Sequence, residues 1–239
     1  MTDVGWQVRP LQMAPAGRLI DDGITLFDGL ADAPRPVLRW YRSTQPAIVL
    51  GRGQGALAVD PGDVTVVTRF SGGGAVWLSP DVLSLDVLLP AGHPWVTDRL
   101  TEAFDHVGRV WADALTGLGV PKLTVHAGPS TARRRGSARE QLLAAVCYAT
   151  VGRGEVLWHG RKLVGLAQRR RRYATMVQCG LLRRWRPQRL LRGLGADPDD
   201  PGVLAAAVGL DEVCAHPPDD DAVVAAVTAA FAAAAATRP

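Results

Sequence analysis

The apolar residues of the chain recur with two different periods, which predict two kinds of element. Over residues 16–30 and residues 97–118 they fall three and four positions apart, the period of a helix with one buried face. Thr97 is the predicted N-cap of the second helix, and Gly117 and Gly119 are its predicted stop. The buried stripe of that helix is expected to be Leu100, Phe104, Val107, Val110, Trp111, Ala114, Leu115 and Leu118.

Shorter apolar or β-branched runs, bounded by turn residues, predict strands. These runs are Val37–Arg42, Ala47–Leu50, Val64–Thr68, Ala75–Leu78, Val82–Leu89, Lys122–His126, Leu142–Thr150, Val156–Trp158, Leu163–Gln168 and Thr175–Leu182. Residues 127–140 are rich in Arg and Gly and hold almost nothing that could be buried, so they are predicted to be a mobile loop. The Ala-rich, Asp-punctuated C-terminal segment predicts helices that end in residues 222–236.

This order predicts an α+β fold with a mostly antiparallel sheet, flanking helices and additional C-terminal helices. Strands and helices do not alternate as they would in a doubly wound parallel sheet. A length of 239 residues fits one large domain, or one domain with a small annex. We expect the main domain over residues 1–195 and an Asp/Ala-rich helical extension over residues 196–239, in the same domain or as the annex.

Composition narrows the class of protein. No window approaches 18 uncharged apolar residues, so no membrane span is predicted. The first ten residues do not show the basic and then apolar pattern of a secretory signal. The three cysteines are odd in number and irregularly spaced, which fits a reducing compartment better than a disulfide framework. We therefore expect a cytoplasmic globular protein.

The net charge of +4 conceals an uneven distribution. Arginines cluster at 133–135, 169–172 and 183–192, whereas aspartates dominate 197–221. Such clusters can bind nucleic acid, nucleotide phosphates or an acidic protein surface, and the alternative is an ordinary solvated face. Nucleic acid is the weaker partner, because no aromatic stacking pattern and no nucleic-acid motif accompany the arginines.

A glycine loop follows one of the predicted strands, in the run Arg69-Phe70-Ser71-Gly72-Gly73-Gly74-Ala75-Val76. Three glycines leave a stretch of backbone on whose N–H groups a ligand can lie, and an anion or a carbonyl is the natural guest. Arg69 can add a charge-assisted contact to a carboxylate or phosphate. The loop is neither a Walker loop nor a dinucleotide-binding fingerprint, since neither spacing is present. A plain tight turn is the alternative.

Lys162 is one of two lysines in a chain with 25 arginines. A lysine in that setting is a candidate for chemistry that arginine cannot perform, because an ammonium acts as a compact charge and can exchange its proton. Cys147 lies fifteen residues earlier and becomes a feasible nucleophile if an ammonium stabilises its thiolate. The alternatives are a surface lysine in a hairpin and a small buried hydrophobic cysteine. His126 and His159 are expected at strand ends or on the surface, and no Cys/His spacing suits zinc.

Four runs taken together resemble a known family. They are GRGQ at 51–54, RFSGGGAV at 69–76, CYATVGRGEV at 147–156 and GRKLVGLAQRR at 160–170. In this order the chain resembles the lipoate–protein ligase family of the biotin/lipoate protein-ligase superfamily, which includes cysteine-dependent octanoyltransferases. The resemblance covers residues 36–185 and implies an antiparallel sheet, flanking helices and an acyl tunnel.

The resemblance implies an enzyme of protein lipoylation that joins an octanoyl or lipoyl group to a lysine of a lipoyl carrier domain. The arginine clusters favour a carrier domain with an acidic surface. The resemblance also implies Lys162 and Cys147 as catalytic residues, with the acyl group passing from a carrier thioester to Cys147 and then to the acceptor amine. No cofactor is then required, and no residue is assigned to a metal. The substrate-binding residues that it implies are Arg69, Ser71, Gly72, Gly73, Gly74, Ala75, Val76, Trp77, Gly165, Ala167, Gln54 and Glu155.

Departures from the family pattern keep two alternatives open. The Asn-Asp pair of ATP-using ligases is Gly154-Glu155 here, and Phe70, Leu78 and Leu166 replace the usual residues around the loop and the lysine. The first alternative is a ligase that uses ATP and magnesium to activate free lipoate through an acyl-adenylate, with Cys147 in the core. The second is a non-catalytic relative that binds acyl groups or nucleotides.

Overall fold

The computed structural model describes residues 5–133 and 135–236, and within them the strands form two sheets. The larger sheet has the order β1-β2-β6-β10-β9-β8-β7, and the smaller has the order β4-β3-β5. The large sheet comprises β1 (Gln7–Ala14), β2 (Val37–Ser43), β6 (Val82–Pro90), β7 (Leu123–Val125), β8 (Val156–Trp158), β9 (Arg161–Arg170) and β10 (Ala174–Leu182). The small sheet comprises β3 (Ala47–Leu50), β4 (Thr65–Thr68) and β5 (Val76–Leu78).

All neighbouring strands of the large sheet are antiparallel except β1 and β2, which are parallel and joined through α1. In the small sheet β3 is parallel to β4 and antiparallel to β5. The predicted α+β class with a mostly antiparallel sheet is therefore confirmed. The helices are α1 (Ala16–Asp28), α2 (Glu102–Gly117), α3 (Ala138–Ala145), α4 (Gln188–Gly193), α5 (Pro201–Ala206), α6 (Leu210–Val213) and α7 (Asp220–Ala236). Three-residue 3-10 turns stand at Gly29–Ala31, Arg52–Gln54 and Cys147–Ala149.

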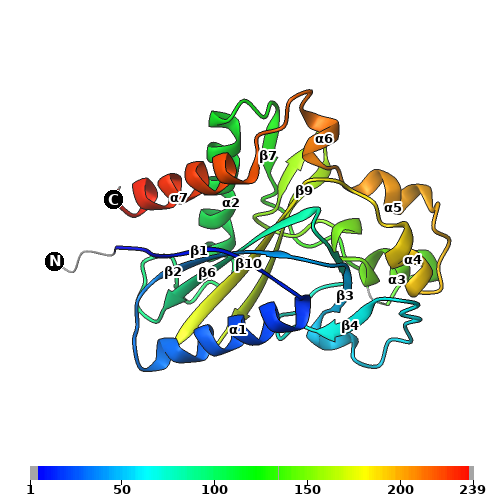
Figure 1. Cartoon of the computed structure of the whole chain (residues 1–239), viewed down its shortest axis with the longest axis horizontal. Helices are drawn as coiled ribbons and strands as arrows, with labels where there is room; N and C mark the ends of the chain where they lie inside the picture. The colour runs from blue at the N-terminus through cyan, green and yellow to red at the C-terminus, as the bar shows by residue number, and fades with distance from the viewer. Residues whose placement is uncertain (1–4, 134, 237–239) are drawn as a thin grey trace.

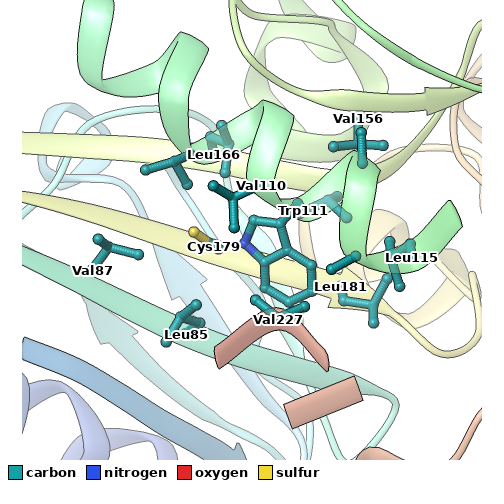
Figure 2. Close-up of a cluster of buried hydrophobic side chains, with 14 of the residues drawn as sticks. Leu85, Val87, Val110, Trp111, Leu115, Val156, Leu166, Cys179, Leu181 and Val227 are labelled. Carbon is teal, nitrogen blue, oxygen red and sulfur yellow. The ribbon is translucent and has the colours of Figure 1, made fainter. Parts of the chain in front are cut away.

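Helices α2 and α7 lie on one face of the large sheet, and α1 lies on the other (Figure 1). The main core fills the α2 face, where the fully buried Trp111 packs among Leu115, Leu181 and Val227 (Figure 2). Cutting Trp111 to alanine is expected to cost about 3–5 kcal/mol of folding free energy, because the cavity left behind cannot fully collapse.

Strand β6 directs apolar side chains into the main core and buried polar side chains to the opposite face of the sheet. Side chains alternate across a strand, so Leu83, Leu85 and Val87 enter the core beneath α2. Ser84 and Asp86 point to the other face, although both are buried. That face supports the candidate site.

One predicted strand is wrong, and the predicted helix over 97–118 is present as α2 but starts later than expected. The strand expected over Leu142–Thr150 is instead the end of α3 followed by the 3-10 turn at 147–149. Ser137 caps α3 and accepts from the Glu140 amide, while the Glu140 carboxylate accepts from the Ser137 amide, a capping box that starts a helix. Helix α2 begins at Glu102 with Thr101 as its N-cap, not Thr97.

Thr97 instead donates to the Glu102 carboxylate from the preceding turn. Leu100, predicted in the buried stripe, precedes the helix and is 62% exposed. Of the loop expected over 127–140, residues 138–140 belong to α3, and Arg134 lies outside the described residues. Strand β1 was not predicted, because Pro10 interrupts it; proline is tolerated there since β1 is an edge strand with an irregular register.

The predicted C-terminal helix is confirmed as α7, which packs against α2. Its Val223, Val227 and Phe231 belong to the main core, and the Trp6 indole donates to the Phe231 carbonyl oxygen at 3.1 Å. The boundary near residue 195 stays a prediction, and residues 1–4 and 237–239 of the two expected ranges lie outside the described residues. No helix within the described ranges is long and apolar enough to cross a membrane.

Candidate functional site

The glycine loop is folded around the side chain of Arg69. The buried guanidinium donates to the carbonyl oxygens of Gly72 and Gly74, both at 2.8 Å, to that of Val49 at 3.3 Å and to the Ser71 hydroxyl at 3.1 Å. Because these bonds occupy all three guanidinium nitrogens, Arg69 serves the loop itself in this structure. Two loop carbonyls are thereby turned toward the arginine.

The backbone N–H groups of the three loop glycines, unlike two of the loop carbonyls, have no hydrogen-bond partner in the part of the chain that the structure describes. Among the described residues, no hydrogen-bond acceptor lies on the N–H groups of Gly72, Gly73 or Gly74. Gly73 has a φ of +98°, which favours glycine, and a Cβ at this position would lie 4.0 Å from the Cys147 sulfur. The loop therefore presents free N–H donors next to a thiol, as a nest for a developing negative charge would.

Cys147 is tied to this loop through the backbone. Its N–H donates to the Ala75 carbonyl oxygen at 2.9 Å, and the Ala75 N–H donates to the Ala145 carbonyl oxygen at 2.6 Å. The Gln54 amide also donates to that oxygen of Ala145, at 3.0 Å. Gln54 thus holds the segment before Cys147 against the loop. A Cβ on Gly74 would lie 2.7 Å from the Cys147 nitrogen, so only glycine allows this approach.

Lys162 is buried, with 1% of its surface exposed, and is not the surface lysine of the alternative interpretation. Its ammonium lies 2.7 Å from a Glu155 carboxylate oxygen and donates to the Cys147 carbonyl oxygen at 2.7 Å. An ammonium has three N–H donors, so one donor remains for a substrate or a thiolate.

Glu155 is held in place by the backbone. One of its carboxylate oxygens accepts from the Gly152 N–H at 2.6 Å, and the other accepts from the Leu166 N–H at 3.1 Å. Both oxygens are thus engaged, and the charge of the carboxylate is balanced by Lys162. Burial of this pair is compatible with stability because every member is hydrogen-bonded.

Tyr148 anchors the residue after the cysteine. Gly165 and Gly180 pair directly across β9 and β10, and the absence of two side chains leaves room for the Tyr148 ring on the sheet. Its hydroxyl donates to the Gly180 carbonyl oxygen at 2.7 Å. Burial raises the pKa of Tyr148 well above its usual range, so the phenol stays neutral.

Two cavities meet at Cys147 and Leu166, which line both of them. The first is an open cleft of about 750 Å³ whose wall includes Gly73, Gly74, Arg133, Arg135 and Lys162. The second is a narrow pocket of about 80 Å³ with a largely apolar wall. Its lining includes Val49, Arg69, Val76, Val82, Tyr148, Gly165, Ala167, Gln178 and Cys179. A polar cleft and an apolar pocket with a thiol between them suit a substrate that has a reactive head and an aliphatic tail.

The structure thus gathers most of the residues implied by the resemblance. The glycine loop, Cys147, Glu155 and Lys162 adjoin the cleft, while Val76, Gly165 and Ala167 line the apolar pocket. Trp77 lies away from both, beneath the Arg189 guanidinium, and Ala75 is fully buried. His126 and His159 lie at strand ends, as predicted, and line neither cavity. Sequence reasoning assigned no role to Tyr148, Gln178 or Asp86. Asp86 could have been found from the sequence, because it is a charged residue inside the apolar run of β6.

The fold has solved counterparts, and the three described here are each under 25% identical. Lipoate-protein ligase A bound with ATP superposes with a TM-score of 0.68 at 17% identity, over 95% of this chain and 84% of that one. A bipartite lipoate protein ligase of Thermoplasma acidophilum, studied with its E2 lipoyl domain, gives a TM-score of 0.63 at 17% identity, over 95% and 82%. Biotin protein ligase of Aquifex aeolicus gives 0.51 at 10% identity, over 96% and 70%. These likenesses establish the fold.

The sequence decides the family. The family described as the lipoyl protein ligase A/B catalytic domain matches residues 25–232. The chain belongs to this family. Among curated relatives, Octanoyltransferase LipM of Exiguobacterium sp. is 29% identical over 184 residues, which are 74% of this chain and 65% of that protein. Octanoyltransferase LipM of Moorella thermoacetica is 30% identical over 158 residues, 64% and 55% of the two chains. The chain therefore spans less than two thirds of the relatives that it matches.

Proposed function

We propose that this protein is a cysteine-dependent acyltransferase of protein lipoylation. It moves an octanoyl group, or a lipoyl group, from a carrier thioester to Cys147 and then to a lysine of an acidic lipoyl carrier domain. The position of Cys147 carries the proposal, because its thiol stands where the polar cleft meets the apolar pocket, beside free loop amides. The relatives named Octanoyltransferase LipM support it.

The residues of the site have separate roles in this reaction. The Cys147 thiolate attacks the thioester carbonyl, the carbon–sulfur bond to the carrier breaks, and the carrier thiolate leaves and takes up a proton. The N–H groups of Gly73 and Gly74 stabilise the negative charge on the carbonyl oxygen. The third donor of Lys162 stabilises the thiolate. The acceptor amine then attacks the acyl group, loses a proton, forms the amide and releases Cys147.

The alternative ligase reaction needs ATP and magnesium. Glu155, the acidic residue before the lysine, has both oxygens engaged by Lys162, Gly152 and Leu166. Within the described ranges, no group of three or more His, Cys, Asp and Glu side chains could hold a metal ion. Magnesium at a nucleotide site is commonly held by one or two carboxylates together with the phosphates, so this finding does not separate the two reactions. We favour the reaction that needs no cofactor because Glu155 is fully engaged and because the curated relatives are named octanoyltransferases.

The arginines suggest where an acidic partner binds. Arg169 and Arg170 end β9, and Arg171 and Arg172 lie in the turn before β10. None of these four arginines forms an ion pair with a described residue, whereas Arg153 and Arg161 pair with Asp105 and Glu212. Burial and the neighbouring Arg52 and Arg171 lower the pKa of Arg169. Positive charge at the end of β9 and in the following turn, which has no acidic partner among the described residues, would attract an acidic acceptor domain. A cytoplasmic location fits the three free thiols.

The test is the intact mass of an unmodified lipoyl domain after incubation with this protein. One tube contains octanoyl-carrier protein without ATP, and the other contains free lipoate with ATP and magnesium. A mass gain in the first tube only, with an octanoyl adduct on Cys147, is expected. A gain in the second tube only would establish the ligase. No gain in either would favour a binding protein.

A further inference from the structure

A row of three polar side chains crosses the large sheet beneath the glycine loop. Arg39, Asp86 and Gln178 stand opposite one another on β2, β6 and β10, with Arg39 and Asp86 buried and Gln178 half-buried. The Arg39 guanidinium lies 2.8 Å from the Asp86 carboxylate and also donates to the Leu19 carbonyl oxygen and to Gln12. Gly23 makes room for it, since a Cβ there would lie 2.9 Å from a guanidinium nitrogen.

This row fixes the orientation of the Gln178 amide. The Asp86 carboxylate receives Arg39 on one oxygen, and the Tyr41 hydroxyl and the Gln178 amide nitrogen on the other, both at 3.2 Å. An ionised carboxylate accepts hydrogen bonds and donates none. Gln178 must therefore turn its NH₂ group to Asp86 and its amide oxygen away.

The amide oxygen of Gln178 points at the glycine loop. It accepts from the fully buried Ser71 hydroxyl at 2.5 Å. Ser71 in turn accepts from Arg69, the side chain that gathers the loop carbonyls. Asp86 thus sets the direction of the Ser71 hydroxyl through Gln178. Through this hydrogen bond the glycine loop is attached to strand β10 of the large sheet.

We propose that Gln178 is a positioning residue, which holds Ser71 and thereby keeps the free N–H groups of Gly73 and Gly74 beside Cys147. The proposal rests on the proposed function for its effect on rate. Donors that stabilise a transition state must be fixed before it forms, and a displacement of about 1 Å can cost about a hundredfold in rate. Gln178 also lines the apolar pocket, but its side-chain hydrogen bonds go to Ser71 and Asp86 and not to Cys147.

A double-mutant cycle tests this chain of contacts. The variants are Ser71→Ala, Gln178→Met and the pair of substitutions, with Gln168→Met as the matched control, because Gln168 lies on the adjacent strand and forms no side-chain hydrogen bond. The measurement is the rate of octanoyl transfer onto Cys147 from an octanoyl thioester, by intact mass, at several donor concentrations.

Each single variant is expected to lower the maximal rate of Cys147 acylation about ten- to a hundredfold, with the half-saturating donor concentration within about threefold. The double variant should be no slower than Ser71→Ala, since residues that act as a unit are not additive, and Gln168→Met should resemble the wild type. Effects that multiply in the double variant would overturn the proposal. So would a raised half-saturating donor concentration with an unchanged maximal rate, which would make Gln178 only a wall of the acyl pocket.

Amide hydrogen exchange over residues 70–78 gives a readout that does not need activity. Gln178→Met should speed amide exchange in this segment and leave exchange in α2 unchanged. Unaltered exchange over residues 70–78 would contradict the proposal that Gln178 holds the loop. If Gln178→Met does not fold, Ser71→Ala breaks the same hydrogen bond from the other side. A wild type that forms no acyl-cysteine refutes the proposed function, while the exchange result still decides whether Gln178 holds the loop.

Discussion

The Lys162 ammonium and the Glu155 carboxylate lie 2.7 Å apart, and only 2% and 4% of the two side chains is exposed. Each member of so deeply buried a pair depends on the other, because removing one would leave the remaining charge buried without a partner or water. Lys162 also donates to the carbonyl oxygen of Cys147, so this pair connects β9 with the candidate nucleophile.

Breaking this pair should destabilise the fold. Lys162→Met is expected to lower the free energy of unfolding by about 3–5 kcal/mol, since it leaves the Glu155 charge unpaired. Adding Glu155→Gln removes that charge, so the double variant should lose less than the sum of the single effects. Urea denaturation measures both. Arg18→Met, in an exposed pair with Asp22, is the control and should cost less than about 1 kcal/mol. Additive losses would mean that the two side chains act independently.

Cys147→Ser should abolish acyl transfer with little effect on folding. Serine is nearly isosteric, but its hydroxyl is a far weaker nucleophile than a thiolate, and we expect the rate to fall at least about a thousandfold. Cys214→Ser is the control, because Cys214 lines neither cavity and should keep full activity. The assay is the intact mass of the enzyme, for the acyl-enzyme, and of the acceptor domain, for its modification. A Cys147→Ser enzyme that still lipoylates the acceptor would indicate the ligase reaction.

Two glycines of the loop, Gly72 and Gly74, should respond differently to the same substitution. A Cβ on Gly74 would lie 2.7 Å from the Cys147 nitrogen and 2.8 Å from the Ala145 carbonyl oxygen, whereas a Cβ on Gly72 meets nothing within 4 Å. Gly74→Ala should therefore cost about 1–3 kcal/mol through a backbone shift. Gly72→Ala should stay within about 0.5 kcal/mol of the wild type. Thermal unfolding of both variants checks this, and equal melting temperatures would contradict the close approach.

The sequence predicted α1 from the helical spacing of its apolar residues, and β6 and β10 from apolar runs bounded by turn residues. It failed over residues 142–150, where a short apolar run fits a strand or a helix equally well, and the capping box at Ser137 decided the outcome. The resemblance brought Cys147, Lys162 and the glycine loop together. No local pattern could show that Arg69 turns inward, or that Gln178 reaches Ser71 across 107 positions, because long-range packing sets both contacts.

Charge reversal at the turn between β9 and β10 should weaken binding of the acceptor. Arg171→Glu with Arg172→Glu removes unpaired positive charge, and we expect the acceptor KM to rise about tenfold at low salt, with little change in acylation from a small thioester. Arg186→Glu is the control, since this exposed arginine follows the opposite end of β10. The difference in KM should shrink as salt screens the charges. An unchanged KM would exclude this turn as the docking surface.

His93 should make the fold sensitive to acid. Its side chain is 6% exposed, its ring lies against Trp6 and Trp95, and burial, aided by the nearby His106, lowers its pKa from 6.5 to about 4. The folded state therefore favours the neutral imidazole, while the unfolded chain takes up a proton below about pH 6.5. The stability contributed by neutral His93 is complete above that pH and is lost as the pH falls toward 4.

The size of this loss follows from the shift. It should reach about 2 kcal/mol at pH 5 and about 3 kcal/mol near pH 4, because each pKa unit corresponds to about 1.4 kcal/mol. His93→Asn keeps an acceptor for the Trp95 N–H, which donates to the His93 Nδ1 at 3.2 Å, but cannot take up a proton. The free energies of unfolding of the two proteins, measured in urea from pH 7 to pH 4, should therefore converge as the pH falls. Parallel curves would show that His93 does not titrate on unfolding.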